Sequence, residues 1–227
     1  MTRPKTSIAG QLNAAQLAVN NSLADAEIQA LVSGFGYAGR SLAAGRGLSE
    51  RAQAAVQAQK LAAGTQQDAT QILQAAQKVA ADAYQALAKV ARAACDPPQL
   101  TTLGLSGKMP NDTAGFLAAA YTLFDNAARL GSLSGFGYTA EKLAAERGKI
   151  TAYDESNQKQ EAAKGAAQQA TREQEAALAA LNEWMAQYLK IAKVALREKP
   201  QLLEKLGVAA RTSKTAAQRT ARQKPEE

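Results

Sequence analysis

The amino-acid sequence contains an internal repeat, and a repeat limits the architectures that are open to a chain. The pentapeptide SGFGY occupies residues 33–37 and recurs at residues 134–138, which is 101 positions later. The same offset carries the tripeptide LAA from residues 42–44 to residues 143–145. Alanine richness alone does not produce the same aromatic pentapeptide twice. The sequence therefore predicts two copies of one supersecondary unit.

Further matches extend the repeat in both directions with small gaps. The tripeptide PQL occurs at residues 98–100 and again at residues 200–202, and a Leu-Gly pair follows each copy. These matches place the first repeat at about 8–105 and the second at about 113–208. Neither repeat is expected to bury its apolar face alone, so we predict that 1–208 form a single helical domain from two halves.

Each repeat is predicted to contain a short helix followed by a long one. Apolar residues at spacings of three and four mark the short helices, and Asp25 is expected to start an additional helical turn in the first repeat. The segment after each SGFGY is rich in strong helix formers and lacks proline until Pro97 and Pro200, where we expect the long helix to stop. A break at Gly64 and Gly165 is the alternative to continuous helices. Continuity is favoured because one interior glycine costs only about 1 kcal/mol.

The fold class predicted from these elements is all-α, an antiparallel helical bundle with pseudo-two-fold symmetry. The SGFGY segments are interpreted as helix C-caps with a tight reversal, in which each phenylalanine ring folds back over the apolar seam. The residues to which this turn and packing role is assigned are Gly34, Phe35, Gly36, Tyr37, Gly135, Phe136, Gly137 and Tyr138.

The duplicated pattern also resembles a group of alanine-rich bacterial proteins that are built from two tandem helical repeats. The resemblance is carried by SGFGY, by the LAA and Arg-Gly pairs that follow it, and by the closing Pro-Gln-Leu and Leu-Gly motifs. It covers about residues 8–208. It implies a bacterial source and an all-helical fold, and it implies no activity.

Composition excludes most enzyme chemistry. The chain of 227 residues has no histidine, which removes Ser-His-Asp and Cys-His catalysis and histidine-based metal sites. The single cysteine, Cys95, has no imidazole to activate it and is expected to pack as a small hydrophobic residue. The Gly-Lys pair at residues 107–108 lacks the spacing of a phosphate-binding loop and is interpreted as part of an inter-repeat linker. We therefore expect no enzymatic activity, no cofactor and no metal.

The charge balance suggests partners without identifying one. Lys and Arg number 27 against 20 Asp and Glu, so the formal net charge is +7. Residues 209–227 are predicted to form a basic disordered tail that could contact anions through Arg211, Lys214, Arg219, Arg222 and Lys224. No apolar run is long enough to span a membrane, and a cytoplasmic location is expected. The leading functional hypothesis is a structural or protein-interaction bundle that binds a protein partner or itself. The alternative is non-specific nucleic-acid binding through the basic surface and tail.

Overall fold

A computed structural model describes residues 7–208 of the chain, and every element within that range is helical. The chain divides into two compact units. Unit 1 comprises residues 7–59 and 170–208 of the described range, and unit 2 comprises residues 60–169. Each unit therefore combines the beginning of one sequence repeat with the end of the other.

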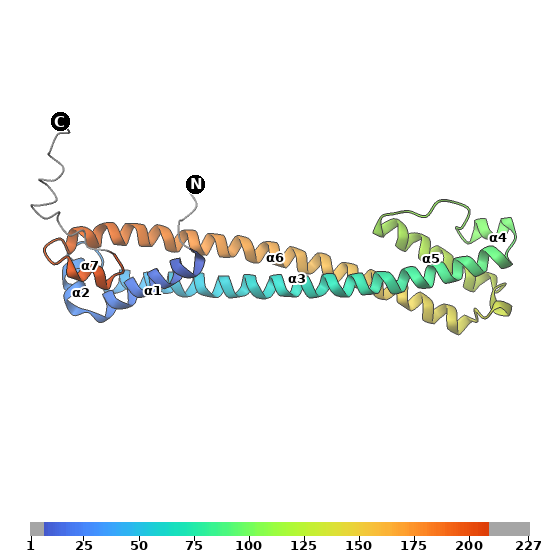
Figure 1. Cartoon of the computed structure of the whole chain (residues 1–227), viewed down its shortest axis with the longest axis horizontal. Coiled ribbons are helices and arrows are strands. Elements are labelled where there is room, and N and C mark those ends of the chain that lie inside the picture. The colour runs from blue at the N-terminus through green and yellow to red at the C-terminus, as the bar shows by residue number, and fades with distance from the viewer. Residues whose placement is uncertain (1–6, 209–227) are drawn as a thin grey trace, which may run out of the picture. The chain divides into compact units, whose positions relative to one another are not determined.

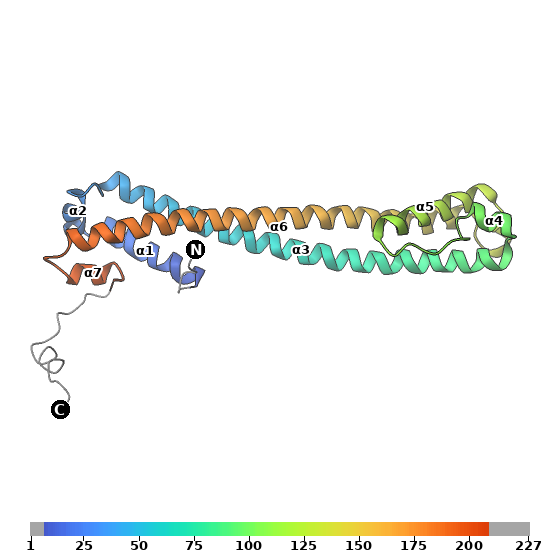
Figure 2. The same cartoon turned by 90° about the horizontal axis from the view of Figure 1, so that it is seen from above.

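Unit 1 is built from helices at the two ends of the described range. It contains α1 (Ile8–Ala24), α2 (Ala26–Ser33) and the first part of α3 (Gly39–Ala94). The last part of α6 (Ala140–Ala195) and the short α7 (Gln201–Lys205) complete it. Figures 1 and 2 show α1, α2 and α7 lying beside these parts of α3 and α6.

Unit 2 is continuous in sequence. The rest of α3 leads into α4 (Pro97–Thr102), and a linker connects α4 to α5 (Thr113–Leu130). A 3-10 turn, η1 (Ser134–Phe136), then leads into the first part of α6. In both units the core joins residues of α3 and α6, so the two long helices pack together.

Capping residues determine where the shorter helices begin and end. The Asp25 side chain accepts hydrogen bonds from the backbone N–H groups at the start of α2, which confirms the predicted extra helix. The Asp112 carboxylate caps α5 in the same way, and the left-handed Gly131 (φ 61°) ends that helix. The helix α3 ends at Ala94, close to Pro97 as expected, whereas α6 ends at Ala195, five residues before Pro200. Each proline segment also starts a short helix. A capping box between Asp96 and Gln99 begins α4, which the sequence interpretation did not anticipate.

Both long helices are continuous for 56 residues. Gly64 lies inside α3 and Gly165 lies inside α6, and neither glycine interrupts its helix. No atom lies within 4 Å of a Cβ added at either position, so these glycines are not required by close packing. The prediction of unbroken helices is confirmed.

The core of unit 1 contains a tight aromatic cluster. The rings of Trp184 and Tyr188 stack with centroids 5.1 Å apart, and the Tyr37 ring packs against both. The Tyr188 hydroxyl forms a buried hydrogen bond with the Ser22 hydroxyl. Gly45 of α3 makes room for this cluster, because a Cβ at that position would lie 2.3 Å from the Cη2 atom of Trp184.

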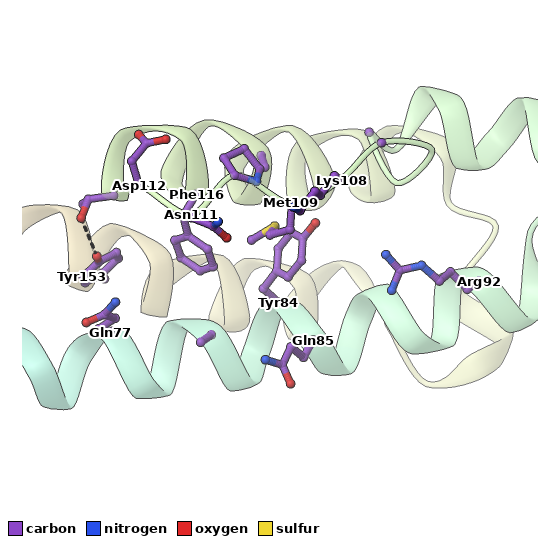
Figure 3. A pocket seen from close by; sticks show the side chains of 16 residues that line it. Gln77, Tyr84, Gln85, Arg92, Lys108, Met109, Asn111, Asp112, Phe116 and Tyr153 are labelled. Atoms are coloured by element: carbon purple, nitrogen blue, oxygen red, sulfur yellow. Dashed lines mark hydrogen bonds between the residues drawn. The ribbon is translucent and has the colours of Figure 1, made fainter.

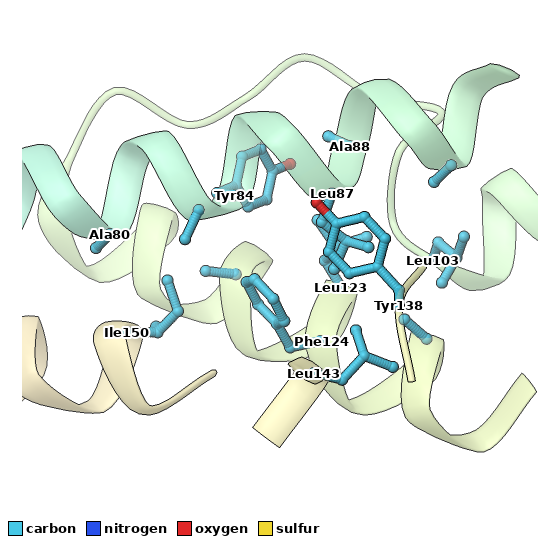
Figure 4. Close-up of a cluster of buried hydrophobic side chains, with 14 of the residues drawn as sticks. Ala80, Tyr84, Leu87, Ala88, Leu103, Leu123, Phe124, Tyr138, Leu143 and Ile150 are labelled. Atoms are coloured by element: carbon cyan, nitrogen blue, oxygen red, sulfur yellow. The ribbon is translucent and has the colours of Figure 1, made fainter. Parts of the chain in front are cut away.

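The core of unit 2 has its largest side chains between α3, α5 and α6 (Figure 4). Leu87 of α3 and Phe124 of α5 are fully buried, and Ile150 of α6 is buried with them. Tyr138, the last residue of the second SGFGY, packs into the same core. Bulky residues near the ends of the long helices therefore supply much of each core.

Candidate functional site

A cavity of about 450 Å³ lies within unit 2 (Figure 3). Its walls come from the C-terminal part of α3, the N-terminal part of α5, the linker between α4 and α5, and one residue of α6. The lining residues are Gln77, Ala81, Tyr84, Gln85, Arg92, Gly104, Gly107, Lys108, Met109, Pro110, Asn111, Asp112, Thr113, Phe116, Ala119 and Tyr153. This volume falls in the range of small-molecule sites in proteins.

The linker is held in place by its two ends. The left-handed Gly104 (φ 73°) terminates α4, and the Leu105 N–H donates to the Leu100 carbonyl. At the other end the linker packs closely on α5 because Gly115 has no side chain. A Cβ at Gly115 would lie 2.5 Å from the Cβ atom of Pro110. The segment interpreted from sequence as a plain linker is therefore one wall of a cavity.

Three aromatic rings form the apolar part of the cavity. The Phe116 ring lies between those of Tyr84 and Tyr153, with centroid separations of 5.7 Å and 5.8 Å. The Tyr153 hydroxyl donates to the Thr113 hydroxyl at 3.3 Å, so the position of this phenol is fixed. Edge and tilted ring contacts of this kind form a rigid apolar surface against which a flat molecule can lie.

The polar part of the cavity carries unpaired hydrogen-bond donors. Tyr84 is only 7% exposed, but its hydroxyl, which has no hydrogen-bond partner among residues 7–208, is accessible from the cavity. Burial raises the pKa of Tyr84 and the positive charge of Arg92 lowers it, with burial the larger effect. Arg92 and Lys108 form no ion pair within the described part of the chain. The Asp112 carboxylate, by contrast, accepts a hydrogen bond from the Gly115 N–H at 2.8 Å.

The two SGFGY turns adopt the predicted reversal. Gly36 (φ 85°) and Gly137 (φ 81°) are both left-handed, a conformation that glycine adopts without strain. The N–H of each following tyrosine donates back to the last core residue before the turn, Val32 in unit 1 and Leu133 in unit 2, at 3.2 Å in both. The reversal assigned to these segments is confirmed, but the C-cap role holds only for the first copy, because Gly34 caps α2 whereas Gly131 ends α5 before the second SGFGY begins.

The predicted packing of the phenylalanines is wrong. The Phe35 side chain is 49% exposed and Phe136 is 59% exposed, so neither ring covers an apolar seam. The core position is already taken by the residue before the turn, and the aromatic residue that packs inward is the tyrosine after it. Tyr138 is buried, and Tyr37 is half-buried against Trp184 and Tyr188.

The other predicted site residues are distributed as follows. Arg211, Lys214, Arg219, Arg222 and Lys224 lie outside the residues that the structure describes. Gly34 and Gly135 belong to exposed turns, each within its own unit. Sequence reasoning missed the cavity residues on α3. Their one signal is that Tyr84 and Arg92 lie about two helical turns apart and therefore share a face.

Within residues 7–208 the structure contains no cluster of three or more His, Cys, Asp or Glu that could hold a metal ion. Among the described helices, none combines the length and the hydropathy that crossing a bilayer requires. Comparison with family models, with curated proteins and with solved structures finds no match to this chain. Function is therefore inferred from the chain's own geometry.

Proposed function

We propose that this chain is a non-enzymatic interaction protein that presents Phe35 and Phe136 to apolar pockets on a partner protein. The observation that carries the proposal is the exposure of both rings on the same kind of turn. Exposed aromatic residues held in fixed positions are typical anchors of protein interfaces.

The turns hold the two rings on defined backbone. In unit 1 the Phe35 N–H donates to the Val32 carbonyl at 3.0 Å, and the Phe136 N–H in unit 2 donates to the Leu133 carbonyl at the same distance. The left-handed glycine that follows each ring closes the turn with a further hydrogen bond. Fixed backbone of this kind lowers the conformational entropy that is lost on binding.

The exposed area is large enough to matter for binding. A phenylalanine buries at least about 150 Å² when fully enclosed, so a half-exposed ring leaves roughly 75 Å² to be covered by a partner. At about 25 cal/mol per Å², covering it contributes about 2 kcal/mol for each ring. This is the size of an interface hot spot.

We also propose that the two sequence repeats are structurally equivalent, so that the two phenylalanines present the same surface. Supporting observations come from both units. The Asn21 side-chain amide donates to the Lys205 carbonyl at 2.6 Å, and the Asn126 amide donates to the Thr102 carbonyl at 2.6 Å. In sequence, Asn21 aligns with Asn126, and each carbonyl belongs to the residue directly before a Leu-Gly pair.

Site-specific photocrosslinking tests the proposal. The photoreactive residue p-benzoylphenylalanine replaces Phe35 or Phe136 in the full chain, and Leu61, which is 73% exposed, serves as the control position. We expect the same crosslinked protein from positions 35 and 136 and not from position 61. A second copy of this chain as the crosslinked protein would identify self-association as the interaction.

Binding measurements with the purified partner then decide the role of the rings. Phe35→Ser and Phe136→Ser are each expected to weaken binding at least tenfold, while the free energy of unfolding falls by no more than about 2 kcal/mol, because only about half of each ring is buried. The same species from all three positions, or unchanged affinity of both serine variants, would contradict the proposal.

Nucleic-acid binding by residues 209–227 stays a prediction, because those residues lie outside the described range. A gel-shift assay at low salt, with and without this segment, tests it. If the full chain shifts neither DNA nor RNA, the alternative function is excluded.

A further inference from the structure

The cavity of unit 2 has a property that the proposed interaction does not use. Its lining combines an apolar surface with donors that lack acceptors in the described part of the chain. The Phe116 ring, flanked by Tyr84 and Tyr153, forms the apolar side. Figure 3 shows the Tyr84 hydroxyl and the Arg92 guanidinium on the same side of α3.

The charges around the cavity favour an anion. Arg92 and Lys108 contribute two positive charges, and Asp112 contributes the one negative charge of the lining. The Asp112 carboxylate caps α5, so it is committed to the helix N-terminus and does not neutralise either cation through an ion pair. A ligand that brings its own negative charge would meet two cations and a phenolic donor.

The Tyr84 phenol also favours a ligand that accepts hydrogen bonds. Tyr84 is 7% exposed, and its hydroxyl, which has no acceptor among the described residues, remains accessible from the cavity. An anionic group placed against Tyr84 accepts a charge-assisted hydrogen bond, which is stronger than a neutral one.

We propose that this cavity binds a small amphipathic organic anion. The flat apolar body of the ligand lies against Phe116 and the two tyrosine rings. Its carboxylate, sulfonate or phosphate group accepts hydrogen bonds from the Tyr84 hydroxyl and interacts with Arg92 and Lys108. The cavity of about 450 Å³ has room for a ligand of one or two fused rings with such a group.

Two fluorescent probes separate the anionic group from the apolar body. The first is 8-anilinonaphthalene-1-sulfonate, and the second is N-phenyl-1-naphthylamine, which has the same rings without the sulfonate. Both are titrated into the full chain. We expect the sulfonate probe to bind at least tenfold more tightly than the neutral probe. Equal affinities would overturn the proposal.

Charge variants test the named residues. Arg92→Gln and Lys108→Gln are each expected to weaken binding of the sulfonate probe about fivefold to tenfold and to leave the neutral probe unaffected. Tyr84→Phe keeps the ring and removes the hydroxyl donor, so it should also weaken binding of the sulfonate probe and leave the neutral probe unaffected. The matched control is Lys193→Gln, since Lys193 stands 101 positions after Arg92, in unit 1, and does not line the cavity. Equal effects of Arg92→Gln and Lys193→Gln would show a non-specific charge effect and would overturn the assignment.

Methionine methyl groups report where the probe binds. Met109 lines the cavity, whereas Met185 belongs to the core of unit 1. In a chain with ¹³C-labelled methionine methyl groups, addition of the sulfonate probe should shift the Met109 signal and leave the Met185 signal in place. A shift at Met185 without one at Met109 would place the probe elsewhere and would refute the site, whatever the outcome of the crosslinking experiment on Phe35 and Phe136.

Discussion

Replacing Gly45 by alanine should destabilise the protein, although the same change elsewhere in a helix normally stabilises it. Gly45 lies within α3, where alanine is favoured over glycine by about 1 kcal/mol. Its added Cβ, however, would lie 2.3, 2.4 and 2.7 Å from three atoms of the Trp184 ring. The ring cannot withdraw freely, because it stacks on Tyr188 and contacts the edge of Tyr37.

The magnitude follows from these two opposing effects. Overpacking of a core costs 1–3 kcal/mol, and the short contacts place this site near about 3 kcal/mol. After the gain of about 1 kcal/mol in helix propensity, Gly45→Ala should lower the free energy of unfolding by about 2 kcal/mol. Gly47→Ala is the matched control, since no atom lies within 4 Å of a Cβ at that position, and it should raise stability by up to about 1 kcal/mol.

Urea unfolding followed by circular dichroism measures both variants. Trp184 is the one tryptophan of the chain, so its fluorescence reports directly on the site of the clash. In a Trp184→Leu background the clash is removed, and Gly45→Ala should then stabilise as Gly47→Ala does. If Gly45→Ala stabilises the wild-type chain, the indole does not pack on α3 as described, and the account of the unit 1 core is wrong.

The remaining predictions concern single buried or charged groups and the units themselves. Ser22→Ala should lower the free energy of unfolding by about 1–3 kcal/mol, because it leaves the buried Tyr188 hydroxyl without its partner. Ser49→Ala should instead raise the free energy of unfolding by up to about 1 kcal/mol, because the Ser49 hydroxyl is buried with no partner among the described residues. The hydrogen bond from Lys205, with those from the α2 backbone, lowers the pKa of Asp25. The stability that the ionised Asp25 carboxylate contributes is therefore present above the ordinary aspartate pKa and is lost as the pH falls through the lowered pKa. As the pH is lowered from 6 to 2, the melting temperature of Asp25→Asn should therefore fall less steeply than that of the wild-type chain. A fragment of residues 60–169 should unfold cooperatively when expressed alone, since it contains the whole unit 2 core. If this fragment shows no cooperative transition, the chain folds as the single domain expected from its sequence.

Local features of the fold follow from sequence because they depend on neighbouring residues. Asp25 and Asp112 cap helices as their side chains predict, and Gly36 reverses the chain where a left-handed residue is needed. The direction in which Phe35 points is not local. It depends on the residue before the turn already filling the core, so the ring that was expected inside is about half exposed.

The cavity lies beyond sequence reasoning for a related reason. Helical spacing places Tyr84 and Arg92 on one face of α3, but it does not indicate what covers that face. The cover is the linker between α4 and α5, which Gly115 allows to pack closely on the start of α5. The linker and α3 line the same cavity through the fold of unit 2, and no periodic pattern in the sequence marks that arrangement. Lys108 was visible only as part of an incomplete phosphate-loop motif.

The division of the chain into one continuous and one discontinuous unit has a consequence for the order in which the protein matures on the ribosome. All of unit 2 is available once Gln169 has emerged, so its core can close early. Helices α1 and α2 are made first but cannot complete their core until the last part of α6 and α7 follow. At a translation rate of 5–20 residues per second, that delay after unit 2 is complete lasts on the order of seconds. During this interval the apolar faces of α1 and α2 are uncovered, and chaperones have their best opportunity to bind the nascent chain.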